Sequence, residues 1–192
     1  MTPNILPLSV ARFRLHPVEA RYAPVFCFAL LTASCALASF VLACATPLAA
    51  FAVVAAAALP MRSALLVTTG AWLVNQTIGF GTLHYPIDAS TIAWGFVIGA
   101  AALAATLASA VALRSLPPNR KPLVLALTLV CAYAAYELTL FAATPFLGGA
   151  GAFTPAIVAR LGVLNAGWMI GLVAVCEIIC LIHPFHRGHA VS

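Results

Sequence analysis

Polar side chains that could hold a ligand interrupt four otherwise apolar stretches of the sequence. Tyr133, Tyr136 and Glu137 follow the spacing i, i+3 and i+4, which places them on one face of a helix. Aromatic faces hold a flat or apolar ligand, and a few amides and a carboxylate orient it. The candidate ligand-binding residues are Asn75, Gln76, His84, Tyr85, Trp94, Tyr136, Glu137, Asn165 and Trp168.

The motifs of common enzymes and nucleotide-driven pumps do not occur in the sequence. It contains no P-loop, no glycine-rich dinucleotide fingerprint and no HExxH pattern. We therefore expect no enzyme activity, no intrinsic cofactor and no energy source within this chain. His84 is the first candidate metal ligand, and Cys44 is a second donor. The six cysteines form no CxxC pair, and we expect them to be small buried hydrophobic residues rather than disulfides or a zinc site.

The composition indicates that these polar groups are positioned by membrane helices. Hydrophobic residues make up 64% of the 192 residues and charged residues only 7%, whereas soluble domains have about 45–50% and about 25%. We predict an all-α polytopic membrane protein, a six-transmembrane-helix bundle, with helices over 23–44, 47–59, 63–80, 91–113, 123–144 and 154–182. The first helix is expected to be an uncleaved span rather than a signal peptide.

The predicted organisation is a cytoplasmic N-terminal segment over 1–22, a transmembrane domain over 23–183 and a cytoplasmic tail over 184–192. The second helix is shorter than the roughly 20 residues that a crossing needs. It is therefore either tilted or a partial span. A count of five crossings would place the two termini on opposite sides.

Basic residues set the expected orientation and replace any nucleic-acid interpretation of the net charge of +5. With both termini in the cytoplasm, only Arg160 falls near the outer side, as the positive-inside rule favours. We therefore expect a multi-pass protein of the bacterial inner membrane with no nucleic-acid partner. The cytoplasmic basic residues are Arg12, Arg14, Arg21, Arg62, Arg114, Arg120, Lys121 and Arg187.

Depth along the helices brings several of the candidate residues to one level in the outer half of the membrane. Asn75 lies about 18 Å above the cytoplasmic end of its helix, and Glu137 and Asn165 fall at a similar depth. This coincidence predicts a pocket open to the outside. The simpler alternative is that the amides bond neighbouring helices and that Trp94 and Tyr85 anchor the interface. Glu137 is either protonated, paired with Arg160 or ligand-binding.

Small residues recur at four-residue spacing and allow helix backbones to approach closely. Gly95 and Gly99 form one such pair, and Ala101, Ala105 and Ser109 form a row. Packing within the bundle is the simpler interpretation. Docking of a partner protein is the alternative.

Two sequence stretches carry a family resemblance. WLVNQTIGFGTLHYP over 72–86 and STIAWGFVIGAAALAAT over 90–106 resemble the BtuM-type cobalamin transporters, which are related to the S-components of energy-coupling-factor (ECF) vitamin transporters. The resemblance implies cobalamin as the transported ligand. It also implies an ECF-type coupling subunit with ATPases as partners, docked on Ala29 and Ala33. The cysteine that ligates cobalt in this family has no counterpart among residues 75–83. His84 is then the nearest donor to cobalt. The resemblance therefore provides no cysteine for the family's removal of the upper cobalt ligand.

The function expected from the sequence is therefore an inner-membrane uptake protein. It would bind a vitamin-sized ligand, cobalamin first, from the periplasmic side and move it inward. The alternatives are a non-transporting structural subunit of a larger membrane complex, or a membrane metal or haem carrier.

Overall fold

The computed structural model of the chain describes residues 15, 18–42, 45–117 and 120–182. Within these residues every regular element is a helix and no strand occurs, so the predicted all-α class is confirmed. The elements are α1 Ala23–Leu42, α2 Leu48–Ala58, α3 Met61–Gly81, α4 Ala89–Ser115, α5 Lys121–Leu147, the short 3₁₀ helix η2 Ala150–Phe153, and α6 Pro155–Ile182.

Four of the described helices, α1, α4, α5 and α6, are long and apolar enough to cross a membrane. By helix length and hydropathy the chain is a multi-pass membrane protein. The helix α2 is apolar but has only 11 residues, about 16 Å at 1.5 Å per residue. The helix α3 has 21 residues and is more polar, with Asn75, Gln76 and several threonines along it.

The helix ends differ from the predicted ones by a few residues, for local chemical reasons. The prediction ended the fifth helix at residue 144, whereas α5 continues through Pro145 to Leu147. Proline cannot donate a hydrogen bond to the carbonyl four residues earlier. The hydroxyl of Thr144 donates to that carbonyl, Phe141 O, at 2.8 Å. The fourth helix begins at Ala89 because Asp88 caps it, accepting from Thr91 N at 2.9 Å.

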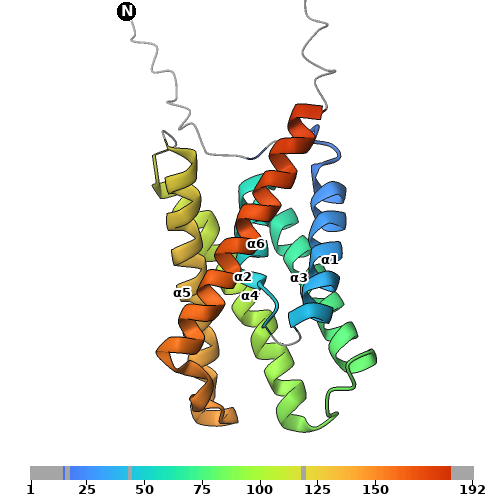
Figure 1. The fold of residues 1–192 in the computed structure, drawn as a ribbon, viewed down its shortest axis with the longest axis vertical. Coiled ribbons are helices and arrows are strands. Elements are labelled where there is room, and N and C mark those ends of the chain that lie inside the picture. Colours follow the sequence, from blue (N-terminus) through green and yellow to red (C-terminus); the bar gives the residue numbers. More distant parts are fainter. Residues whose placement is uncertain (1–14, 16–17, 43–44, 118–119, 183–192) are drawn as a thin grey trace, which may run out of the picture.

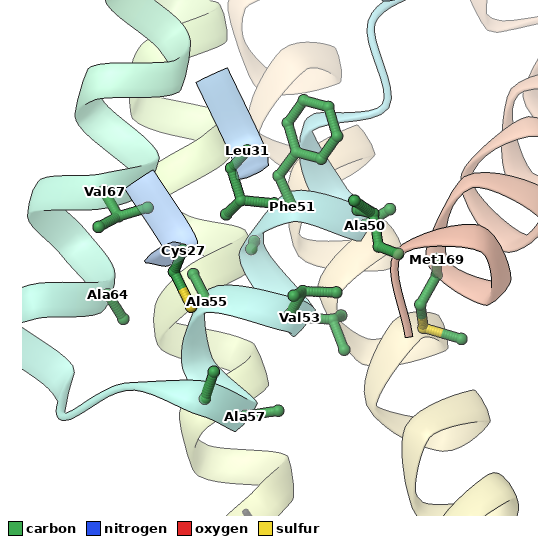
Figure 2. Packing of buried hydrophobic residues seen from close by; sticks show 14 of the residues in the cluster. Cys27, Leu31, Ala50, Phe51, Val53, Ala55, Ala57, Ala64, Val67 and Met169 are labelled. Carbon is green, nitrogen blue, oxygen red and sulfur yellow. The ribbon is translucent and has the colours of Figure 1, made fainter. Parts of the chain in front are cut away.

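The helix α2 is the centre of the fold. All of its residues except Ala56 are buried, and it contacts each of the other five α-helices. Figure 2 shows Phe51 and its neighbours on α2 facing Leu31 and Cys27 of α1 on one side and Met169 of α6 on another. At its far end the amide of Leu15 donates to Ala57 O at 2.9 Å. A helix surrounded in this way has no face for lipid.

Close approach of α3 and α4 depends on two glycines. The indole Nε1 of Trp72 donates to Gly95 O at 2.9 Å, and a Cβ added at Gly99 would lie 2.7 Å from the same indole ring. A Cβ added at Gly95 would lie 2.5 Å from Oε1 of Gln76. Ala101, Ala105 and Ser109 are also buried. The structure thus supports packing within the bundle for these small residues.

Cysteines divide into two groups. Cys27, Cys35 and Cys176 are buried in the bundle, as predicted for small hydrophobic residues, and the thiol of Cys35 donates to Ala71 O at 3.0 Å. Cys131 and Cys180 are exposed on the bundle surface, which contradicts the prediction of burial for these two. Each lies on a face of a long apolar helix that other helices do not cover. Cys44 lies outside the described residues.

The length of α2 divides the bundle into two halves. In Figure 1, α1 begins and α6 ends at the top of the view, while the α3–α4 and α5–α6 connections lie at the bottom. We call the half that contains α2 the packed half. The half beyond the N-terminal end of α2, towards those two connections, is the hollow half, because α2 does not extend into its centre.

Candidate functional site

A partly open cavity of about 260 Å³ lies in the hollow half, next to the N-terminal end of α2. Its wall comes from the α1–α2 connection, α4, α5, η2 and α6. Because α2 is short, α4, α5 and α6 continue past its first residue and enclose this space. The lining residues are Ala45, Thr46, Trp94, Ile98, Tyr136, Glu137, Leu140, Gly149, Ala152, Phe153, Ile157, Leu161 and Asn165.

Asn165 separates the cavity from the packed half. Its Oδ1 accepts from the amide of Ala50 at 3.0 Å, and its Nδ2 donates to Leu161 O at 2.9 Å. The first amides of a helix lack partners within the helix, and Pro47 at the N-cap provides no side-chain acceptor. Asn165 of α6 therefore caps α2 from another helix while also lining the cavity.

Asn75 is committed to helix packing. Its Nδ2 donates to Ser39 Oγ at 3.0 Å and to Thr46 Oγ1 at 2.9 Å. The adjacent amide of Gln76 donates to Asn75 Oδ1 at 3.1 Å. This chain of bonds ties α3 to the end of α1 and to the α1–α2 connection. Asn75 thus holds Thr46 in the cavity wall but does not itself line the cavity.

Among the described lining residues, Glu137 is the one acidic side chain. Its Oε1 is buried and has no hydrogen-bond partner among the residues that the structure describes. The ion pair with Arg160 that the sequence left open is not formed in the described chain, where the one salt bridge joins Arg21 to Glu19. The side chain of Arg160 is exposed. A carboxyl group inside a membrane bundle without a counter-charge is costly and points to function.

Two tyrosines of α5 flank this carboxyl group. Tyr136 lines the cavity and packs against the core. Tyr133 lies beside Glu137, but its hydroxyl donates to Val158 O at 2.7 Å. A hydroxyl has a single proton to donate, so Tyr133 cannot donate to Val158 O and to Glu137 at once, although it lies close enough to interact with that carboxyl group. The Oε1 of Glu137 has no partner within the described residues.

Trp94 brings a second aromatic face into the cavity from α4. Gly149, in the connection before η2, packs against it: a Cβ at Gly149 would lie 3.5 Å from the indole Cζ2. Gly149 has φ of 86°, a backbone conformation that favours glycine. Phe153 of η2 lines the cavity and packs edge-on against Phe141, with ring centroids 5.4 Å apart.

The nine predicted site residues thus separate into two sets. Trp94, Tyr136, Glu137 and Asn165 line one cavity, whereas the other five do not. His84 is exposed on the α3–α4 connection. Tyr85 covers Gly79, and Trp168 packs against the core. Asn75 and Gln76 bond within the helix packing.

Several lining residues were missed by sequence reasoning. Thr46 and Phe153 lie in segments identified only as a helix break and a loop. Ile157 and Leu161 are ordinary apolar residues of a membrane helix, and nothing in the pattern distinguishes them from those facing lipid. The adjacent glycines Gly148 and Gly149 were a usable sequence signal that the α5–α6 connection folds back tightly, and both have positive φ in the structure.

Metal binding has no preformed cluster in the described part of the chain, where no three His, Cys, Asp or Glu residues come together. The histidines at 183, 186 and 189 and Cys44 lie outside the described residues. Comparisons of the sequence with protein-family models, with curated proteins and with solved structures found no match.

Proposed function

We propose that this chain is a membrane uptake protein that captures a vitamin-sized ligand in the hollow half of the bundle and moves it inward. The observation that carries the proposal is the cavity of about 260 Å³ with Glu137 in its wall. Ligand sites in proteins are mostly apolar cavities with a few polar groups that set orientation. This wall has that composition, and among the described residues Oε1 of Glu137 is the buried side-chain polar atom without a hydrogen-bond partner.

The distribution of charge supports capture from outside. Arg62 begins α3, Arg114 ends α4 and Lys121 begins α5, all at the end of the bundle where α1 begins and α6 ends (Figure 1). By the positive-inside rule that end faces the cytoplasm. The cavity then opens towards the periplasmic side of a bacterial inner membrane.

The six-crossing topology is part of the proposal. Five helices have the length to cross, since α3 has 21 residues and a crossing takes about 20. The helix α2 returns the chain to the cytoplasmic side through the centre of the bundle. Because α2 is buried on all sides, inward passage of a ligand requires α2 to move relative to α4, α5 and α6.

Cobalamin is the ligand that the family resemblance implies, and size is the argument against it in this conformation. Cavities for drug-sized ligands have about 300–1,000 Å³, and a corrinoid is larger than such ligands. The cavity of about 260 Å³ would therefore admit a corrinoid only after the connections that roof it move apart. The geometry as it stands favours a smaller ligand.

A coupling subunit remains part of the proposal as a partner. Ala29 and Ala33, the docking residues implied by the resemblance, are both exposed on α1. Small residues on an exposed helix face allow another helix to approach closely. The same face would serve a non-transporting subunit of a larger complex, so ligand binding is what separates the two functions.

The test asks whether a ligand co-purifies with wild type and is lost from a variant whose cavity is filled. Leu140→Trp places a large ring in the cavity, and Leu138→Trp is the matched control, because Leu138 is 66% exposed on the same helix. We expect a small molecule, identified by mass spectrometry of the purified protein, in wild type and Leu138→Trp but not in Leu140→Trp. Titration with cyanocobalamin and with haemin by calorimetry then tests those two ligands directly.

The same experiment can reject the proposal. If no small molecule is enriched in wild type, neither titration saturates, and a second membrane protein co-purifies with all three variants, the chain is a structural subunit. Saturable one-to-one binding of haemin without cyanocobalamin would instead make it a haem carrier.

A further inference from the structure

The wall of the cavity has an unbalanced charge. Trp94, Tyr136 and Phe153 contribute three aromatic rings, and Glu137 contributes a carboxyl group, while the described lining carries no cationic side chain. Aromatic faces present negative potential, which attracts cations. The aromatic and charged side chains of this wall therefore favour a positively charged occupant.

Groups near Glu137 do not correct this imbalance. The proton of Tyr133 goes to Val158 O, and Tyr136 contributes no charge. Arg160 is the basic residue of α6 on this side of the bundle, and it is exposed and unpaired with Glu137. Thr46 and Asn165 are neutral and bond to other helices. An ionised carboxyl group inside a membrane bundle needs a charged or hydrogen-bonded partner, and within the described chain the buried Oε1 of Glu137 has none.

Two amides at the end of α2 that could attract an anion are already bonded within the protein. The N-terminus of a helix attracts negative groups through its free amides and its dipole. Here the amide of Ala50 is already bonded to Asn165 Oδ1 at 3.0 Å, and that of Leu48 to Thr46 O at 2.8 Å. An anionic ligand would have to displace these bonds while facing Glu137.

We propose that the cavity takes a small organic cation, a protonated amine on an aromatic or apolar body whose N–H donates to Oε1 of Glu137. This inference rests on the proposed function and names its ligand class. The amine supplies the missing counter-charge, and the rings of Trp94, Tyr136 and Phe153 enclose the body. The volume of about 260 Å³ lies just below the range of about 300–1,000 Å³ for sites of drug-sized ligands, which limits the ligand to small molecules.

The experiment compares three probes of similar shape and different charge at neutral pH. The thermal unfolding temperature of the full chain in lipid nanodiscs is measured against 2-phenylethylamine, 2-phenylethanol and 3-phenylpropanoate. A ligand that binds only the folded state raises this temperature with concentration. We expect saturable stabilisation by the amine, and an apparent affinity at least tenfold lower for the neutral alcohol and for the anion.

The variants Glu137→Gln and Glu177→Gln separate the site from general effects of an amine on the bilayer. Both remove one carboxylate from a membrane helix, but Glu177 is exposed on α6 and lies outside the cavity wall. Glu137→Gln should lower the apparent affinity for the amine at least tenfold, and Glu177→Gln should leave it unchanged. Both variants also report their own unfolding temperature without ligand, which shows whether they fold.

Three outcomes overturn the inference. They are equal or tighter binding of the alcohol or the anion, undiminished amine binding by Glu137→Gln, and no stabilisation by 2-phenylethylamine or by a panel of other small aromatic amines. If one of these occurs while a neutral or acidic molecule co-purifies with wild type and Leu138→Trp but not with Leu140→Trp, the proposed function stands and only the ligand class is wrong. If no molecule co-purifies either, both fail.

Discussion

The packed half and the hollow half of the bundle are built from the same long helices and differ in what lies at their centre. In the packed half α2 contributes apolar side chains that are almost completely buried. In the hollow half the same position holds a cavity with rings, an amide and an unpartnered carboxyl oxygen. The difference teaches that one short helix can provide the core of a membrane bundle and, by ending early, leave space for a cavity beside it.

The largest expected contrast is between two phenylalanines. Phe51 of α2 is completely buried, and Phe51→Ala should lower the free energy of unfolding by about 3–5 kcal/mol. Phe153 is half-buried in the cavity wall, and Phe153→Ala should lower it by about 1 kcal/mol. Unfolding of both variants in mixed micelles by denaturing detergent measures the difference. Equal losses would mean that the two halves are packed alike.

A second variant tests the packing between α3 and α4. Gly99→Ala places a Cβ 2.7 Å from the Trp72 ring, and this overpacking should destabilise the fold by about 1–3 kcal/mol. Gly171→Ala on α6 is the matched control, because its Cβ would meet no atom within 4 Å and alanine favours a helix by up to about 1 kcal/mol. The same unfolding assay applies. A stable Gly99→Ala variant would show that the Trp72 contact is loose.

The boundary between the two halves can be tested at Asn165. Asn165→Ala removes the acceptor for Ala50 N and should destabilise the protein by about 0.5–2 kcal/mol, the range for a lost helix cap. Hydrogen exchange should show faster exchange at the first turn of α2, with a smaller change at its last turn. Unchanged protection of the Ala50 amide would remove Asn165 from this capping role.

The smallest effect concerns the pH dependence of the cap of α4 at Asp88. Hydrogen bonds from the amide and hydroxyl of Thr91 lower the pKa of Asp88 below its ordinary value of 3.8. Because the folded pKa is depressed, the cap is fully present above pH 3.8 and is lost as pH falls through the folded pKa. The Thr91 amide chemical shift should therefore titrate with a midpoint below 3.8.

Asp88→Asn is the control for this titration. The variant should remove the pH dependence of the Thr91 shift at the start of α4. A midpoint above 3.8 in wild type would contradict the cap.

Sequence reasoning predicted the helices well, because long apolar runs separated by proline and glycine leave few alternatives in a membrane. It also predicted that Asn75, Glu137 and Asn165 lie at a similar depth, because depth follows from residue count along a helix, and the structure places the last two in one cavity wall. It could not predict the direction in which Asn75 points. That depends on the rotation of α3 about its own axis, which is set by contacts with Ser39 and Thr46.

The role of the second helix was recognised only in part. Its length predicted a tilted or partial span, and the structure shows an apolar helix of 11 residues at the centre of the bundle. What its sequence does not contain is the identity of its neighbours. A run of alanine and valine reads the same whether it faces lipid or five other helices, so neither the burial of α2 nor the cavity beside it follows from composition.

The capping of α2 by α6 has a consequence for how the protein is made. The helix α2 emerges from the ribosome early, while α4, α5 and α6, which surround it, are synthesised later. Until α6 arrives with Asn165, the Ala50 amide lacks its acceptor in the membrane. The insertion intermediate must therefore shelter an unfinished helix end, and a chain truncated before α6 should be a preferred substrate for membrane quality-control proteases.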